Sequence, residues 1–200
     1  MIDYINHKDW LADLRASHTN FPIAKKGTIQ FLATILASAK PKKVLEIGTG
    51  VGFSAIFMAK YIEDIHITTI ERHQMMIDKA KFHFDIHGVT HKIKLIEDNA
   101  IYALENLEKA KQSYDLIFLD AAKGQYINFL PHILNMLPTG AILISDNILQ
   151  IVQKDYNTIE KRKRTIYNNM TQFIQAITTM VCLETIILPI EDGVGFSVRL

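Results

Sequence analysis

The 200-residue chain has a single cysteine, Cys182, and no apolar run approaching the length of a membrane-spanning helix. One cysteine excludes a disulfide framework and a cysteine-based zinc site. The N-terminus MIDYINHKDW lacks both the apolar core of a secretion signal and the arginine-rich pattern of a transit peptide. We therefore expect a cytoplasmic protein with no membrane partner.

Neither sign of charge dominates, because 22 lysines and arginines face 21 aspartates and glutamates, for a net charge of +1. No global field therefore marks a nucleic-acid binder, and any polyanion site must come from local clustering. A hydrophobic share of 48% with 22% charged residues suits one domain over residues 1–200. Two covering helices are predicted in residues 1–40, at Ile2–Ser17 and Lys26–Ala39. The sequence leaves open whether they merely cover the sheet or lie over a ligand site.

After residue 40, short apolar runs alternate with helical patterns of about ten residues. Strands are predicted at Val44–Ile47, His66–Ile70, Lys92–Ile96, Tyr114–Leu119 and Ala141–Ser145. Helices are predicted at Phe53–Ile62, Gln74–His87, Ala100–Ala110 and Gln125–Leu137. The pattern then changes to a polar stretch at Gln150–Arg164, a helix at Arg164–Thr179 and strands at Val181–Leu188 and Phe196–Leu200. The alternation predicts a parallel, doubly wound α/β sheet.

Glycine is scarce, but three of the nine glycines alternate at positions 48, 50 and 52 of VLEIGTGVGFS, between a strand and a helix. Glycine is needed where φ must be positive or where backbone approaches a ligand closely. The dinucleotide-binding pattern would require another glycine at position 53, which is Phe53. The turn therefore favours a nucleotide-like ligand other than a dinucleotide.

Two acidic residues restrict the choice of ligand further. A pyrophosphate beside Glu46 would meet a carboxylate, whereas the sulfonium and ammonium groups of S-adenosylmethionine suit this position. Glu71 ends the next strand, about 20 residues beyond the glycines, where an acid can bind ribose hydroxyls. The alternative is an ordinary strand-to-helix turn with Glu71 in solvent.

Oxygen ligands gather at the carboxyl ends of two later strands. Asp120 follows YDLIFL, and Asp146 and Asn147 follow AILIS. Two carboxylates and an amide suit magnesium or calcium rather than zinc or copper. Taken singly, each residue reads as a helix cap or turn residue. Together, on the edge that carries the glycine turn, they predict a metal site.

Five stretches, VLEIGTGVGFSA, TIER, LDAAKGQY, SDN and PIEDGVGFSV, resemble the magnesium-dependent O-methyltransferases of the catechol and caffeoyl-CoA type. FPIAKKGTIQFL, LDAAKGQY and KRKRTIYNNM resemble most the bacterial branch that methylates 5-hydroxyuridine at the tRNA wobble position. The resemblance implies a Rossmann-like class I methyltransferase fold, with a seven-stranded mostly parallel sheet, helices on both faces and a C-terminal antiparallel hairpin. It also implies a homodimer.

The resemblance assigns roles to individual residues. The cofactor-binding positions that it implies are Glu46, Gly48, Gly50, Gly52 and Ser54 around the glycine turn, Glu71 for the ribose, Asp98, Asn99 and Ala100 on the adenine side, and Asp120. The metal ligands are Asp120, Asp146 and Asn147, and Lys123 lies beside the reacting hydroxyl. Ala121 and Ala122 stand where animal catechol enzymes carry aromatic residues, which argues against a free catechol as substrate.

These residues suggest a mechanism and three functional hypotheses. Magnesium would chelate two vicinal oxygens of the acceptor and lower the pKa of its hydroxyl. Lys123 would act as general base; the alternative is that it only caps a turn.

The protein could be a tRNA O-methyltransferase, a small-molecule O-methyltransferase with a catechol-like or hydroxycinnamoyl acceptor, or a nucleotide-binding oxidoreductase or binding module. The third hypothesis, an oxidoreductase or binding module, gives no role to Glu46 or to the predicted metal ligands Asp120, Asp146 and Asn147. The basic run Lys161–Arg164 favours RNA unless it is only a solvated helix start.

Overall fold

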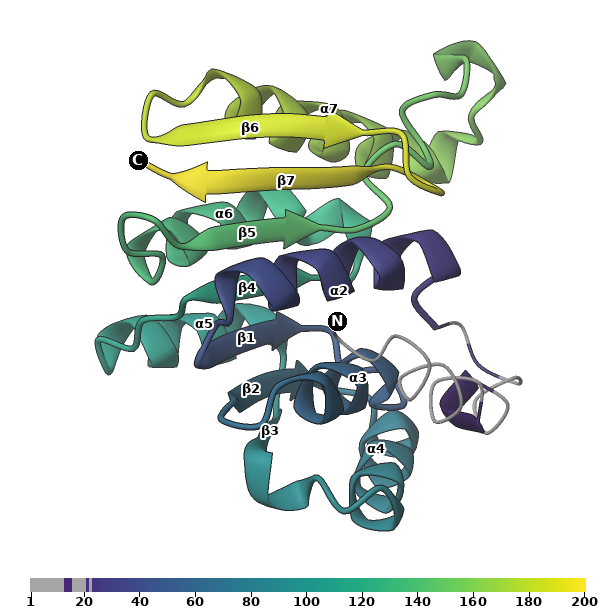
Figure 1. Cartoon of the computed structure of the whole chain (residues 1–200). Coiled ribbons are helices and arrows are strands. Elements are labelled where there is room, and N and C mark those ends of the chain that lie inside the picture. The colour runs from purple at the N-terminus through teal and green to yellow at the C-terminus, as the bar shows by residue number, and fades with distance from the viewer. Residues whose placement is uncertain (1–12, 16–20, 22) are drawn as a thin grey trace.

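The computed structural model describes residues 13–15, 21 and 23–200. Within these residues seven strands form one sheet in the order β3-β2-β1-β4-β5-β7-β6 (Figure 1). The strands are β1 (Lys43–Ile47), β2 (His66–Glu71), β3 (Ile93–Glu97), β4 (Leu116–Leu119), β5 (Ile142–Ser145), β6 (Leu183–Leu188) and β7 (Val194–Arg199). The first five are parallel, and β7 is antiparallel to both β5 and β6. The predicted fold class and its C-terminal hairpin are confirmed.

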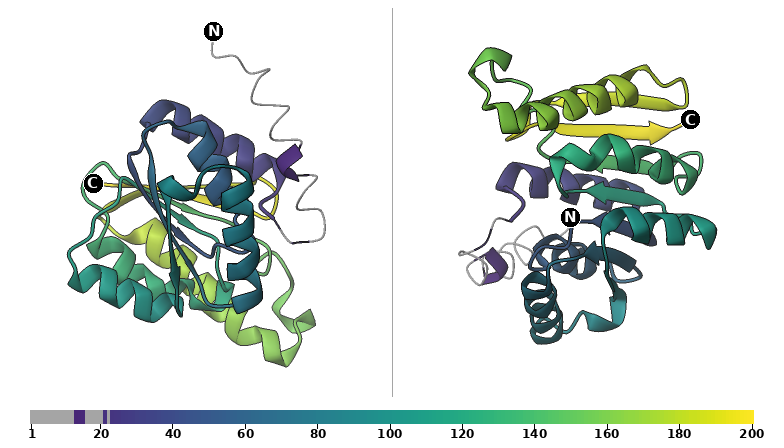
Figure 2. Two further views of the ribbon diagram at one scale, coloured as in Figure 1. Left: turned by 90° about the horizontal axis from the view of Figure 1, so that it is seen from below. Right: turned by 180° about the vertical axis from the view of Figure 1, so that it is seen from behind.

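Helices cover both faces of the sheet (Figure 2). One layer contains α2 (Lys26–Ala39), α3 (Phe53–Tyr61) and α4 (Gln74–Ile86). The other contains α5 (Ala100–Lys109), α6 (Tyr126–Asn135) and α7 (Arg164–Thr179). Within the described residues, no helix is both long and apolar enough to cross a membrane.

The two layers explain why the strands are apolar on both faces. Successive residues of a strand point to opposite sides, and Val44 accordingly packs with the α2–α4 layer while Leu45 and Ile47 pack with the α5–α7 layer. β4 and β5 are buried at every position. Such double burial requires near-continuous apolar runs, which is the pattern that the sequence carries.

Most predicted boundaries lie within a few residues of the observed ones, and those of α2 and α7 coincide with them. β7 begins two residues earlier than predicted, because Val194 pairs with Leu188 in the hairpin. The polar stretch contains two single 3-10 turns, η3 (Tyr156–Thr158) and η4 (Lys161–Lys163). The predicted opening helix, Ile2–Ser17, lies mostly outside the described residues.

The strand order determines where a ligand can bind. β1 lies between β2 and β4, so the connections that leave β1 and β4 run in opposite directions across the sheet. A crevice opens at the carboxyl ends of the strands at such a switch point. The residues after β1, β2, β3, β4 and β5 all reach this edge.

Candidate active site

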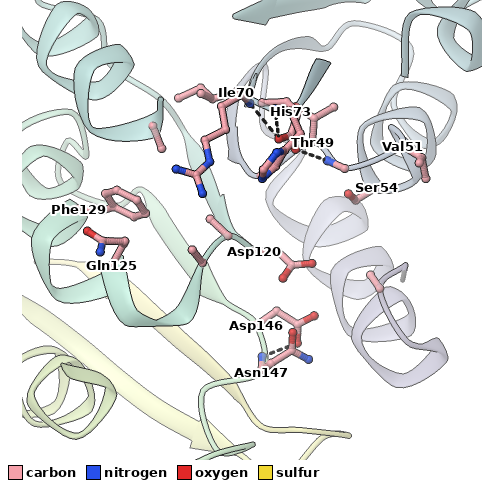
Figure 3. A pocket seen from close by; sticks show the side chains of 18 of the residues that line it. Thr49, Val51, Ser54, Ile70, His73, Asp120, Gln125, Phe129, Asp146 and Asn147 are labelled. Carbon is pink, nitrogen blue, oxygen red and sulfur yellow. Dashed lines mark hydrogen bonds between the residues drawn. The ribbon is translucent and has the colours of Figure 1, made fainter. Parts of the chain in front are cut away.

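A cavity of about 700 Å³ lies at this edge (Figure 3). The predicted site residues that line it are Gly48, Gly50, Ser54, Glu71, Asp98, Asn99, Ala100, Asp120, Asp146 and Asn147. Glu46, Gly52 and Lys123 are not part of its lining. The structure therefore brings the predicted cofactor positions and the predicted metal ligands into one space.

The three glycines of the turn serve different purposes. Gly48 has φ of 102°, and a Cβ there would lie 2.1 Å from the backbone oxygen of Asp120, so only glycine lets the ends of β1 and β4 approach. Gly50 has φ of 52° and faces open space. Gly52 precedes α3, and a Cβ there would lie 2.6 Å from the Phe84 ring. Gly50 thus leaves room for a ligand, whereas Gly48 and Gly52 permit close packing.

Glu46 lies beneath the turn and is fully buried. Its carboxylate accepts hydrogen bonds from Ser54 Oγ and, at 2.5 Å, from Thr69 Oγ1. Burial raises the pKa of Glu46 to about 8; the two hydroxyl donors oppose this shift, and the charges of Asp120 and Glu71 add to it. Glu46 therefore links β1, α3 and β2 under the ligand site rather than forming its wall.

Glu71 is held by backbone donors at the end of β2. Its Oε2 accepts a hydrogen bond of 3.0 Å from the N–H of Gly50, and its Oε1 accepts bonds of 2.8 Å and 3.0 Å from the N–H groups of Arg72 and His73. One strand further, Asn99 caps α5 by accepting a bond of 3.2 Å from the N–H of Ile101. Acidic and amide groups therefore face the cavity in fixed positions beside the glycine turn.

Asp120, Asp146 and Asn147 lie together at the other end of the cavity (Figure 3). Asp146 is only 1% exposed; its Oδ1 accepts bonds of 3.1 Å from Thr28 Oγ1 and 2.8 Å from the N–H of Asn147. Its Oδ2 is buried and has no hydrogen-bond partner within the described residues. Burial, and then the charge of Asp120, raise the pKa of Asp146 to about 6.

This arrangement fits a divalent cation. A buried carboxylate oxygen without a partner is costly, and a cation between the two carboxylates would satisfy it. The described residues contain no cluster of three or more histidine, cysteine, aspartate or glutamate side chains suited to a metal. At this end of the cavity, Asn147 would supply a third protein oxygen from its side-chain amide. Two carboxylates and one amide suit magnesium better than zinc.

Lys123, in η2 (Lys123–Gln125), adjoins the cation end without lining the cavity. Its Nζ donates to Asp120 Oδ1 at 2.7 Å and to the Tyr126 hydroxyl at 2.8 Å. Burial lowers the pKa of Lys123, but the Tyr126 oxygen and the Asp120 carboxylate outweigh it, and the net shift is upward. Lys123 is thus an ammonium here, and the prediction that it is partly neutral depends on a cation beside Asp120.

With the site defined, the chain can be compared with known proteins. A model of the O-methyltransferase family matches residues 7–200. The chain belongs to this family. As a member, the protein is an enzyme that transfers a methyl group to oxygen.

Individual relatives agree with this assignment. Tapetum-specific methyltransferase 1 of Arabidopsis thaliana is 30% identical over 180 residues, covering 85% of this chain and 75% of the relative. A Staphylococcus aureus structure, assigned provisionally as a caffeoyl-CoA O-methyltransferase, has 28% identity and a TM-score of 0.84, covering 98% of this chain and 99% of that one. The SAH-bound Podospora anserina methyltransferase PaMTH1 shares the fold, with 24% identity, a TM-score of 0.81, and coverage of 96% of this chain and 88% of that one.

The O-methyltransferase site also contains residues that the sequence did not reveal. Lys25, at the start of α2, and Asp192, in the β6–β7 loop, line the cavity and form an ion pair of 2.9 Å. Phe129 of α6 contributes an aromatic wall. Thr28 reaches Asp146 across 118 residues of sequence. Lys25, Thr28 and Asp192 fall inside stretches that carry the family resemblance, but no spacing rule links them to the strand ends.

For the second of the two predicted N-terminal helices, the contacts around α2 show how it lies relative to the ligand site. Ile23, Ala24 and Lys25, which lead into α2, line the cavity, so this segment lies over the ligand site. Its remainder packs on the sheet through Ile29 and Leu32 among others. The helix therefore covers the sheet, and the segment that leads into it forms a wall of the site.

The basic run Lys161–Arg164 does not line the cavity. Glu160 accepts bonds from Arg162 at 2.6 Å and from Lys163 at 2.8 Å, while Arg164 lies over the Tyr156 ring. The run occupies η4 and the first residue of α7, in a segment that projects from the cavity edge of the sheet (Figures 1 and 2). The basic run therefore lies outside the cavity.

Proposed function

We propose that this O-methyltransferase transfers the methyl group of S-adenosylmethionine to a hydroxyl that is held, with a neighbouring oxygen, on a magnesium ion. The observation that carries the proposal is the buried, unpartnered Oδ2 of Asp146 beside Asp120 and Asn147, in the same cavity as the glycine turn. Binding of the cofactor alone gives no reason for a buried carboxylate oxygen without a partner. Binding of the acceptor through a cation does, because the cation would be coordinated by this oxygen.

The cofactor end suits S-adenosylmethionine. Glu71 presents a fixed carboxylate for ribose hydroxyls, Asp98 to Ala100 lie where an adenine would fit, and Gly50 leaves space for close approach. The carboxylates on this wall attract the positive sulfonium and ammonium groups. The Podospora anserina methyltransferase that shares this fold is described as SAH-bound, which supports a cofactor of this class.

Methyl transfer is an in-line displacement in which the carbon–sulfur bond breaks, the carbon–oxygen bond forms and sulfur keeps the electron pair. The chain's main task is therefore alignment of the acceptor oxygen with the methyl group. Asp120, Asp146 and Asn147 would hold a magnesium ion, which when bound lowers the acceptor hydroxyl's pKa and fixes its position. The hydroxyl proton leaves to Lys123 Nζ if that amine is neutral, and otherwise to solvent.

For the acceptor we propose 5-hydroxyuridine at the tRNA wobble position, which offers a hydroxyl next to a carbonyl oxygen. Its support is the sequence resemblance and the position of Lys161–Arg164 at the cavity edge. The helix that follows the basic run contacts the cation end of the site. Asn169 of α7 donates a hydrogen bond of 2.8 Å to the carbonyl of Gly124, which is next to Lys123. A wobble base can turn into the cavity while its flanking phosphates meet this basic run.

A small hydroxycinnamoyl-type acceptor is the second candidate, and two observations favour it. Glu160 pairs with Arg162 and Lys163, which reduces the charge available to phosphates. The Staphylococcus aureus relative is assigned provisionally as a caffeoyl-CoA O-methyltransferase. For such an acceptor the Phe129 ring would supply an apolar contact inside the cavity.

The acceptor is tested with a variant in which Lys161, Arg162, Lys163 and Arg164 are all changed to alanine. Wild-type tRNA affinity should fall with salt at a log–log slope of about −0.7 per phosphate contact, and the variant should show a flatter slope and less 5-methoxyuridine by nucleoside mass spectrometry. Changing Lys42, Lys43 and Lys94 to alanine at the opposite end of the strands is the matched control. A basic-run variant with wild-type slope and methylation would refute the RNA contact and favour the small acceptor.

A further inference from the structure

The hydroxyl of Thr28 connects the covering helix to the cation end of the site. Thr28 lies in the first turn of α2, is fully buried, and donates a hydrogen bond of 3.1 Å to Asp146 Oδ1. It does not line the cavity itself. Any influence that it has on the reaction must therefore pass through Asp146.

This contact differs from those of Thr34, Thr171 and Thr178, three other helical threonines in the described part of the chain. The hydroxyls of Thr34, Thr171 and Thr178 donate to carbonyls four residues earlier, at 2.8 to 3.0 Å. Thr28 lies too close to the helix start for such a bond, and the carbonyl four residues earlier, that of Ala24, accepts from Arg15 at 3.2 Å. The Thr28 hydroxyl is thus directed out of its own helix.

The start of α2 is held in place by the β6–β7 loop. Glu191 Oε1 accepts a bond of 2.9 Å from the N–H of Gly27, and Asp192 pairs with Lys25 at 2.9 Å. A Cβ on Gly27 would lie 2.8 Å from Glu191 Oε1, so glycine permits the close approach. These contacts flank Thr28 in the sequence and fix the direction from which its hydroxyl meets Asp146.

We propose that Thr28 is a positioning residue for the cation ligand Asp146. Thr28 and the N–H of Asn147 both donate to Oδ1, so Oδ1 is the protein-facing oxygen and Oδ2 is the oxygen left for the cation. Without the hydroxyl, Asp146 keeps only one donor and the carboxylate can rotate away from this arrangement. The inference rests on the proposed function, because it presupposes a divalent cation at Asp146.

The test compares Thr28→Val, which keeps the shape but removes the hydroxyl, with Thr28→Ser, which keeps the hydroxyl. Thr34→Val is the matched control, because Thr34 lies on the same helix and bonds only its own backbone. Calorimetric titration with Mg²⁺ or Mn²⁺ alone measures cation affinity, S-adenosylmethionine titration measures the cofactor end, and thermal unfolding checks the fold. Loss of a hydrogen bond to a metal ligand typically weakens metal binding about 10- to 100-fold.

We expect Thr28→Val to weaken cation binding by about tenfold or more, with cofactor affinity unchanged and with Thr28→Ser close to wild type. Wild-type cation affinity in Thr28→Val would overturn the inference while leaving the proposed function intact. Equal weakening in the valine and serine variants would also overturn it, because packing and not the hydroxyl would then matter. Failure of the wild-type protein to bind either cation would overturn the inference and the magnesium part of the proposed function together.

Discussion

The two ends of the cavity are assembled in different ways. At the cofactor end, the contacts join neighbouring units of the chain: Ser54 reaches Glu46 across 8 residues and Gly50 reaches Glu71 across 21. At the cation end, Thr28 reaches Asp146 across 118 residues. The first end is the product of one local strand–turn–helix–strand unit, whereas the second exists only when distant segments have packed together.

The two ends also differ in how completely their acids are satisfied. Glu71 accepts three backbone hydrogen bonds, so the cofactor end is ordered without a ligand. Asp146 keeps a buried oxygen without a partner among the described residues. Binding of a cation therefore relieves a cost at one end, while binding of the cofactor at the other adds contacts to a site already formed.

The largest expected effect comes from removing the acid at the cation end. Asp146→Ala should reduce turnover by more than about a thousandfold, because a bound cation contributes several kcal/mol to such a reaction. Cofactor affinity should stay near wild type, since Asp146 lies away from Glu71 and the adenine side. Steady-state kinetics and calorimetry separate these two outcomes.

Asp115→Asn serves as the control, because this acid lies before the amino end of β4 and accepts bonds from the N–H groups of Lys42 and Lys43. Excess chelator should reproduce the effect of Asp146→Ala on the wild-type enzyme. Full activity in chelator would contradict the cation-assisted mechanism and leave Asp146 as a structural residue.

The contrast between the two ends explains how much could be predicted from the sequence. The glycine turn and Glu71 follow from local spacing, and the ends of α2 and α7 follow from local helix signals. Asp120, Asp146 and Asn147 follow from the rule that parallel strands end at one edge. Thr28 and Asp192 do not follow from any such rule, because only tertiary packing brings α2 and the β6–β7 loop to that edge.

A second prediction concerns the cofactor end. Glu71→Ala should weaken S-adenosylmethionine binding by roughly 10- to 100-fold, since a hydrogen bond to a charged group contributes about 1.5 to 3 kcal/mol. Cation affinity should not change. Glu97→Ala is a matched control, because Glu97 pairs with Glu71 in the sheet register but does not line the cavity. Equal cofactor affinity in wild type and Glu71→Ala, measured by calorimetry, would remove Glu71 from the site.

The last prediction concerns Glu46, the buried acid of the cofactor end, and the expected effect is on stability rather than on binding or turnover. Burial raises the pKa of Glu46 from its ordinary value of 4.5 to about 8. Between these pH values the folded protein keeps a proton that the unfolded chain has lost. The free energy of unfolding that depends on Glu46 is therefore fully present below pH 4.5 and declines as the pH rises to about 8, by at most roughly 1.4 kcal/mol per pH unit.

Glu46→Gln removes this titration and should flatten the decline. Other groups, including Asp146, also titrate in this range, so the relevant quantity is the difference between wild type and variant in urea unfolding at several pH values without cation or cofactor. That difference should change steadily between pH 4.5 and 8. A constant difference for Glu46→Gln would show that Glu46 ionises normally, and that its hydroxyl partners hold a charged carboxylate beneath the turn.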